Sequence, residues 1–182
     1  MTTVQPHTAQ GPAPLVKGRG ASALVWAFPL GLGVLADQAS KRWAELHVQP
    51  KVIWTVVPDV LDLRFVRNPA ALFGLGSELA PDLRRALFCA ASVLVLALIA
   101  ALFARTTERR QRAALCLLAT GAIGNLIDRA RSGEVVDFVH LHAGGVLNYA
   151  TFNLADVAIV AGIALLVFEF GRSRPPSPQP SV

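Results

Sequence analysis

One segment limits the possible folds of this chain more than any other. Residues 86–104, ALFCAASVLVLALIAALFA, form a run of nineteen residues without a charged side chain. A helix of about 20 apolar residues is long enough to cross the hydrocarbon core of a bilayer. Three further runs with almost no charge lie at 20–36, 113–127 and 154–170. Only 16% of the 182 residues are charged and 53% are hydrophobic, whereas typical soluble domains are about 25% charged. We therefore expect a membrane protein.

The four runs predict an all-α membrane protein with four transmembrane helices, at about 20–41, 86–104, 112–129 and 153–170. They belong to one domain, residues 20–171. The connection at 44–85 contains VIWTVVPDVLDLRFV (52–66), whose β-branched and aromatic residues predict short strands. It ends in SELAPDLRR (77–85), which is typical of a polar linker or the start of an interfacial helix. The polar tails, 1–19 and 172–182, are expected to be disordered.

The basic residues indicate how the chain lies in the membrane. Lys17 and Arg19 precede the first run, RTTERRQR (105–112) joins the second and third, and Arg172 and Arg174 follow the fourth. Because short cytoplasmic segments carry an excess of Lys and Arg, we expect both termini to be cytoplasmic. The net charge of +5 therefore reflects orientation. No stretch combines a basic stripe with stacking aromatic residues, so we expect no nucleic-acid partner.

With this topology, four acids gather at the outer face of the membrane. Asp37 ends the first helix, Asp128 ends the third, Asp137 lies in the loop that follows, and Asp156 starts the fourth. An ionisable group at membrane depth costs about 2.5–3.5 kcal/mol on insertion scales and usually lines a site. For Asp37 and Asp128, a location in the wet interface explains the sequence equally well. Asp156 is followed by a long apolar run, which favours a functional role.

Asp137 and Asp156 are the best candidates for a catalytic pair. Asp137 is embedded in VVDFV (135–139), and both acids lie among apolar residues. Two carboxyls in one low-dielectric cavity cannot both ionise cheaply, so one keeps its proton and the other becomes a base. Aspartic peptidases use this arrangement: the base activates water, and the acid protonates the carbonyl oxygen or the leaving nitrogen. The N-terminus of the fourth helix favours ionised Asp156 while desolvation opposes it, which leaves both proton assignments open.

Other polar residues lie close to these acids in the sequence. Asn125, Asp128 and Arg129 share neighbouring turns of one helix end. Arg129 can pair with Asp128 or with a lipid phosphate, or it can serve the site directly. Asn153 can cap the fourth helix or orient a neighbouring acid. Four glycines are expected to allow close helix packing rather than phosphate binding: Gly31, Gly33, Gly121 and Gly124.

Two other kinds of site have little support in the sequence. His140 and His142 with Asp137 resemble a metal site only weakly, because His-x-His spacing in a loop is not specific, and we expect no metal. Cys89 and Cys116 fall inside apolar runs and are expected to be buried thiols rather than a disulfide or a nucleophile. Two other functions remain as alternatives: a proton- or ion-coupled transporter that uses the acids as a relay, and a structural assembly subunit.

The order of several motifs resembles the lipoprotein signal peptidase (type II signal peptidase) family. These motifs are DQASK (37–41), RNPAALFGL (67–75), GNLIDR (124–129), VVDF (135–138) and FNLAD (152–156). The resemblance extends from about residue 24 to residue 170 and omits only the two tails.

This resemblance implies an aspartic endopeptidase of the bacterial cytoplasmic membrane. Such an enzyme removes signal peptides from prolipoproteins by cutting before a diacylglyceryl-modified cysteine. By motif, the catalytic aspartates are Asp137 and Asp156. The supporting polar residues are Asp37, Asn68, Asn125, Asp128, Arg129 and Asn153. The resemblance also implies a small external β-platform, a short interfacial helix, an active site near the periplasmic face, a monomer, contact with membrane lipids, inhibition by globomycin, and no cofactor or metal.

One motif departs from the family pattern. Members usually have Asn-x-Gly-Ala-Ala-Phe, whereas Asn68 is followed here by PAALF (69–73). The missing glycine removes easy access to positive φ, and Pro69 biases Asn68 towards an extended backbone. We expect Asn68 to keep its place in the site.

Overall fold

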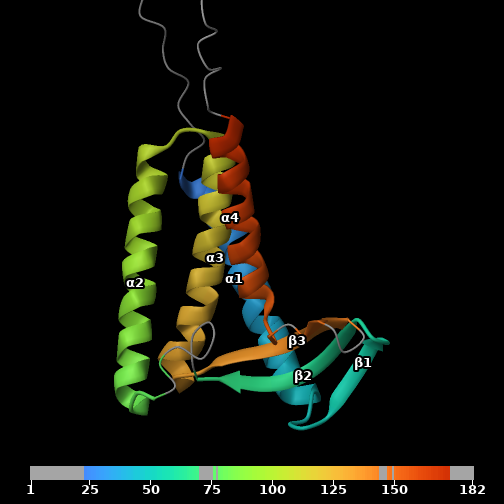
Figure 1. Ribbon diagram of the computed structural model, residues 1–182. Helices are drawn as coiled ribbons and strands as arrows, with labels where there is room; N and C mark the ends of the chain where they lie inside the picture. The colour runs from blue at the N-terminus through green and yellow to red at the C-terminus, as the bar shows by residue number, and fades with distance from the viewer. Residues whose placement is uncertain (1–22, 70–75, 77, 144–146, 149, 173–182) are drawn as a thin grey trace, which may run out of the picture.

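The protein consists of long helices with a small sheet at one end of the bundle (Figure 1). The computed structural model describes residues 23–69, 76, 78–143, 147, 148 and 150–172. The helices are α1 (Ala23–His47), α2 (Pro81–Arg105), α3 (Arg109–Ser132) and α4 (Leu154–Arg172). The strands are β1 (Ile53–Val57), β2 (Leu61–Asn68), β3 (Val135–Ala143) and β4 (Leu147–Asn148). The two predicted tails lie almost wholly outside the described residues.

Three helices in the described part of the chain are long and apolar enough to cross a membrane: α2, α3 and α4. This agrees with the expected membrane protein. The described apolar part of α1 covers only residues 23–36, because Asp37 and Lys41 follow in the same helix. The prediction of four spans therefore remains a prediction, although α1 runs alongside α3 and α4 (Figure 1).

Three helices are clearly longer than the sequence indicated, and one of them is α3, which covers Arg109–Ser132 where 112–129 was expected. α1 continues to His47, and α2 begins at Pro81 rather than at residue 86. Pro81 suits the first turn of a helix, where its missing N–H costs no hydrogen bond, and Asp82 complements the helix dipole there. Residues 81–85 thus belong to α2, and no separate interfacial helix occurs among the residues described between 76 and 85.

The sheet has four antiparallel strands in the order β1-β2-β3-β4. The strands predicted within 52–66 are confirmed as β1 and β2. The segment around Asp137 is a correction, because we expected a loop and the structure has β3. The central strands pair so that Val66 lies opposite Asp137 and Asn68 lies opposite Val135. The β-branched residues of VVDFV favour this extended conformation.

The end of α1 holds the sheet against the bundle. Ala44 of α1 and Val48, which directly follows the helix, form a buried cluster with Phe138 of β3, and Leu63 and Phe65 of β2 pack against it. This cluster fixes β3 close to the ends of α1 and α3. Burial of these apolar side chains is the main force that attaches the sheet.

Glycines bring α1, α3 and α4 close together. A Cβ atom on Gly33 would lie 2.7 Å from Thr120 Cγ2 on α3. On Gly121 it would overlap the carbonyl oxygen of Ala155 on α4, and on Gly124 the Asp37 carboxylate. The predicted packing role is confirmed for these three. It is wrong for Gly31, which has nothing within 4 Å of its Cβ position because it faces away from the other helices.

Candidate active site

The polar residues singled out in the sequence meet where the bundle joins the sheet. The ends of α1 and α3 lie here beside the start of β3 and the first turn of α4 (Figure 1). Asp37 and Asn153 are 0% exposed, and Asp137 is 3% exposed. Asn125 and Asp128 are also buried. Buried polar groups of this kind need hydrogen-bond partners, and the partners found here are almost entirely each other.

Asp137 is held on β3 by two amide side chains. Its Oδ1 accepts a hydrogen bond from Asn153 Nδ2 at 2.7 Å, and its Oδ2 accepts one from Asn68 Nδ2 at 3.0 Å. Burial of the carboxyl raises the pKa of Asp137 to about 6, and the nearby charge of Asp156 adds to this increase. The hydrogen bonds from Asn68 and Asn153 and the charge of Lys41 act in the opposite direction. Asp137 therefore exchanges its proton close to neutral pH.

Asp156 lies in the first turn of α4, where it forms a reciprocal cap with Asn153. The Asp156 backbone N–H donates to Asn153 Oδ1 at 3.0 Å, and the Asn153 backbone N–H donates to Asp156 Oδ2 at 3.2 Å. This is the geometry of a capping box. The other oxygen, Oδ1, accepts from Asn125 Nδ2 at 2.8 Å. The cap fixes the Asp156 side chain at the helix start.

Asn153 joins the two aspartates. Its Nδ2 bonds to Asp137, its Oδ1 bonds to the Asp156 backbone, and Nδ2 also lies 3.2 Å from Asn125 Oδ1. Both roles considered for Asn153, helix cap and orienting group, therefore occur together. Asn125 completes the connection, because it contacts both Asn153 and the Asp156 carboxylate.

A buried ion cluster lies next to Asn125 and stabilises the two aspartates and their amide partners. Lys41 Nζ lies 2.9 Å from Asp37 Oδ2 and 2.9 Å from Asp128 Oδ2, and it donates to Asn125 Oδ1 at 3.0 Å. The two carboxylates also accept hydrogen bonds from backbone N–H groups next to Asp156 and Asp137. Asp37 Oδ1 accepts from Ala155 on α4 at 2.9 Å, and Asp128 Oδ2 accepts from Val136 on β3 at 3.2 Å. Asp37 and Asp128 thus position the backbone next to Asp156 and Asp137.

The sequence interpretation missed two members of this cluster. Gln38 and Lys41 both lie in the DQASK motif (37–41), but neither was assigned a role from the sequence. Gln38 Nε2 contacts Asp37 Oδ2 at 3.2 Å, Asp128 Oδ1 at 3.1 Å and the Gly124 carbonyl oxygen at 3.2 Å. The i, i+4 spacing of Asp37 and Lys41 places them on one helix face and was the available signal.

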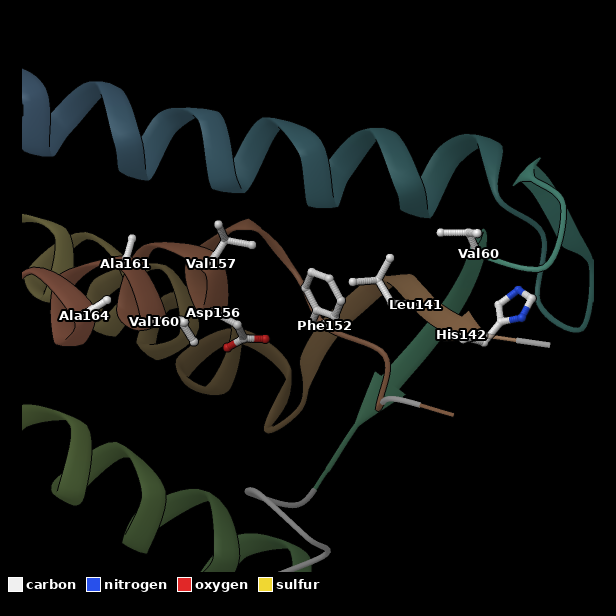
Figure 2. A pocket seen from close by; sticks show the side chains of 10 residues that line it. Val60, Leu141, His142, Phe152, Asp156, Val157, Val160, Ala161 and Ala164 are labelled. Carbon is white, nitrogen blue, oxygen red and sulfur yellow. The ribbon is translucent and has the colours of Figure 1, made fainter. Parts of the chain in front are cut away.

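Asp156 also lines an apolar groove with a volume of about 610 Å³. Figure 2 shows the groove running along α4, past Asp156, to Phe152 and the end of the sheet near His142. Val157 and Val160 are among the residues of α4 that line it. Among the described residues that line the groove, Asp156 is the only one with a carboxylate. A long apolar molecule in this groove would pass directly beside a carboxylate.

Comparison with known proteins identifies the family. The family described as signal peptidase (SPase) II matches residues 30–172. The chain belongs to the signal peptidase II family. It is therefore related to peptidases, and the three apolar helices agree with a membrane-bound member. The match includes every residue of the site described above, so the family assignment covers the whole site.

Relatives with curated names agree with this assignment. The lipoprotein signal peptidase of Geobacter metallireducens is 33% identical over 152 residues, which cover 82% of this chain and 92% of that protein. The lipoprotein signal peptidase of Oleidesulfovibrio alaskensis is 39% identical and covers 72% of this chain and 84% of that protein. That of Moorella thermoacetica is 38% identical, with 77% and 89% covered.

Solved structures share the fold of this signal peptidase II family member. A bacterial membrane enzyme determined by the in meso method at 2.3 Å resolution superposes with a TM-score of 0.74 at 24% identity, covering 87% of this chain and 94% of that one. A second, determined at 1.9 Å, gives a TM-score of 0.73 at 25% identity and covers 82% and 94%.

Arg129 does not form the ion pair with Asp128 that the sequence analysis considered, but its charge lies near the site. Asp128 Oδ2 lies against Lys41, and the Arg129 guanidinium is instead 5.6 Å from the centre of the Phe88 ring. Its positive charge interacts with Asp156, Asp137 and Asp128. Of the two histidines of β3, His142 lines the far end of the groove, and its Nε2 is 3.0 Å from Asp62 Oδ2. The His140 ring stacks on His142.

Proposed function

We propose that this protein is an intramembrane aspartic endopeptidase that removes signal peptides from bacterial prolipoproteins. Cleavage takes place before a cysteine that carries a diacylglyceryl group. The observation that carries this proposal is the bridge through Asn153, which joins Asp137 to Asp156 beside an apolar groove. Membership of the signal peptidase II family supplies the reaction class.

In the proposed reaction, Asp137 and Asp156 share one proton. The ionised carboxylate removes a proton from a water molecule, and the water oxygen attacks the carbonyl carbon of the residue before the modified cysteine. The protonated carboxyl then supplies its proton as the carbon–nitrogen bond breaks, so that the cysteine leaves with a free amine. The pKa of about 6 for Asp137 supports this role, because such a group can gain and lose a proton near neutral pH.

The supporting residues hold the pair in place. Asn125 and Asn153 orient the carboxylates, and Asn68 donates a hydrogen bond to Oδ2 of Asp137. Asp37 and Asp128 steady the adjoining backbone, as described above. Arg129 steadies the negative charge that develops as water attacks.

The groove explains why the substrate must be lipidated. Its α4 side lies along an apolar helix that is exposed on the outside of the bundle, which gives the diacylglyceryl chains and the signal helix lateral access from the bilayer. We place the enzyme in the cytoplasmic membrane with four spans and both termini inside. The site then lies near the periplasmic face, the protein acts as a monomer, globomycin blocks the aspartates, and no cofactor, metal or nucleic acid takes part.

A transporter relay is less well supported. A relay requires ionisable groups spread through the membrane depth. The buried acids of the described helices, Asp37 and Asp128, instead lie at the same end of the bundle as Asp137 and Asp156.

The test compares two versions of one prolipoprotein peptide, with and without the diacylglyceryl group, incubated with the purified protein in detergent. We expect cleavage of the lipidated peptide before the cysteine, inhibition by globomycin, and little cleavage of the unmodified peptide. Absence of cleavage of the lipidated peptide by folded protein would contradict the proposed function. Equal cleavage of both peptides would contradict the proposed role of the groove.

A further inference from the structure

A second cavity lies at the opposite end of the bundle from the two aspartates. It has a volume of about 400 Å³ and is formed by α1, α2 and α3. Arg112 on its lining and Asp128 in the candidate active site are sixteen residues apart on α3, which corresponds to about 24 Å along a helix. The cavity therefore has no part in the proposed peptide cleavage.

The cavity is polar at one end and apolar at the other. The end near the corner between α2 and α3 carries the Arg112 guanidinium and the Trp26 indole. The part further along the helices is lined by Leu30, Ile99 and Ala119, among other apolar residues. A ligand that fits must therefore be amphipathic and must lie with its polar group towards the corner.

Two hydrogen-bond donors define the polar end. The Trp26 Nε1–H is buried, and no acceptor for it exists among the described residues. A buried donor without an acceptor is energetically unfavourable, so an acceptor from a ligand is favoured here. Arg112 supplies a positive charge: its Nε donates to the Thr106 carbonyl oxygen at 2.9 Å, and its guanidinium lies 5.1 Å from the Phe103 ring centre. Trp26 contacts the same Phe103 ring edge-on at 6.2 Å.

The surroundings favour an anionic ligand. The α2–α3 corner also carries Arg105, Arg109 and Arg110. The acids beside them are Glu108 and Glu169 of α4, and Glu169 pairs with Arg110 at 3.3 Å. The helices that form the cavity expose apolar side chains such as Leu98 and Leu102 on their outer surface, as a bilayer requires. A molecule with an anionic phosphate and a long apolar chain, reaching the cavity from the membrane, matches all of these features.

We propose that this cavity binds one anionic phospholipid from the leaflet at the α2–α3 corner. The lipid phosphate or ester oxygens accept hydrogen bonds from Arg112 and Trp26. One acyl chain lies between α1 and α2 along Leu30, Ile99 and Ala119. The bound lipid thus fills the gap between these helices far from the aspartates.

Native mass spectrometry of the full-length protein in detergent tests this proposal. The protein is titrated with phosphatidylglycerol and with phosphatidylcholine that has the same acyl chains. We expect one phosphatidylglycerol to remain bound at concentrations at which phosphatidylcholine does not. Arg112→Gln lowers the affinity for phosphatidylglycerol about tenfold, because a charge-assisted hydrogen bond is lost. Arg109→Gln is the matched control, because it removes the same charge from an exposed position outside the cavity lining and lowers the affinity much less than Arg112→Gln does.

Two further variants keep the test decisive if Arg112→Gln disturbs the α2–α3 corner. Trp26→Phe removes the indole N–H but keeps an aromatic ring beside Phe103, and it lowers the affinity severalfold. Ala100→Phe adds a ring to the cavity lining and prevents stable binding of the acyl chain. Equal retention of the two lipids by the unaltered protein would overturn the proposal. So would unchanged affinity in Trp26→Phe and Ala100→Phe, or an equal loss in Arg109→Gln.

Discussion

Lys41 is the residue on which the buried charges of the site depend. Its ammonium group lies 2.9 Å from both Asp37 and Asp128, and all three side chains are almost completely buried. Two buried carboxylates without a nearby cation would be strongly destabilised by desolvation and mutual repulsion. The backbone bonds from Ala155 and Val136 to these carboxylates would be disturbed with them.

Lys41→Met should therefore destabilise the protein by about 3–5 kcal/mol, because it leaves two buried carboxylates without their cation. Thermal unfolding of the purified protein in detergent measures the change. Lys51→Met is the control, because it removes the same charge from an exposed turn and should have little effect. Stability of Lys41→Met equal to that of Lys51→Met would show that the cluster does not depend on the lysine.

Asn68 should tune the titration of Asp137. Its N–H bonds to the Asp137 carboxylate and lowers the pKa of that group. Asn68→Ala removes this bond and should raise the pKa above about 6, which shifts the corresponding limb of the pH–activity profile upwards by about one unit or less. The profile of kcat/KM against pH measures the shift, with exposed Thr55→Ala as control. An unchanged limb or a shift to lower pH would contradict the role of Asn68.

The sequence predicted the place of Asn68 better than its surroundings. Pro69 indicated an extended backbone at Asn68, and Asn68 is the last residue of β2. The bond from Asn68 to Asp137 depends on the pairing of β2 with β3, which was not predicted. The pairing of Lys41 with Asp128 on α3 could not be predicted either, because Asp128 is 87 residues away along the chain.

At the scale of elements, α3 organises the bundle. It packs against α1, α2 and α4, and it has more buried residues than the other described helices. Small residues make this possible: Gly121 lies so close to α4 that a Cβ atom would overlap the Ala155 carbonyl oxygen. Ala155 directly precedes Asp156, so the packing of α3 on α4 also determines where that carboxylate lies.

Gly121→Ala should separate α3 from α4 and destabilise the protein by about 1–3 kcal/mol, because the overlap involves backbone that cannot move freely. Cleavage of the lipidated peptide should fall as well. Gly31→Ala is the matched control, because its Cβ would meet nothing within 4 Å. That change should be neutral or stabilise α1 by up to about 1 kcal/mol through helix propensity. Equal thermal stability of the two variants would contradict the close-packing account.

Strand β3 and the first turn of α2 were not predicted from the sequence, each for its own physical reason. Strand β3 lacks the alternation of a half-buried strand, since residues 135–138 are all buried. Burial on both faces produces a short apolar run that periodicity cannot distinguish from a loop or helix segment. The start of α2 was missed because charged residues at 82, 84 and 85 were taken as the limit of the helix, although they only limit its apolar part.

On the scale of the whole molecule, the buried acids and one short basic segment lie at opposite ends of the bundle. Arg105, Arg109, Arg110 and Arg112 lie at the α2–α3 corner, and the buried acids lie where the bundle meets the sheet, together with basic residues such as Lys41 and Arg129. The sequence predicted this separation, because hydropathy locates the apolar runs and charge counts locate their ends. It could not predict the groove beside Asp156, which requires α4 and the sheet to be placed together in space.

Cleavage of a diacylglyceryl-modified prolipoprotein peptide by aspartate variants tests the central claim most directly. Asp137→Asn and Asp156→Asn should each reduce the rate by at least about 10²–10⁴-fold, because each removes one partner of the proton-transferring pair. Asp59→Asn makes the same change in an exposed turn and should leave the rate unaltered. Thermal unfolding in detergent identifies variants that remain folded. Full activity in either Asp137→Asn or Asp156→Asn would contradict the proposed mechanism.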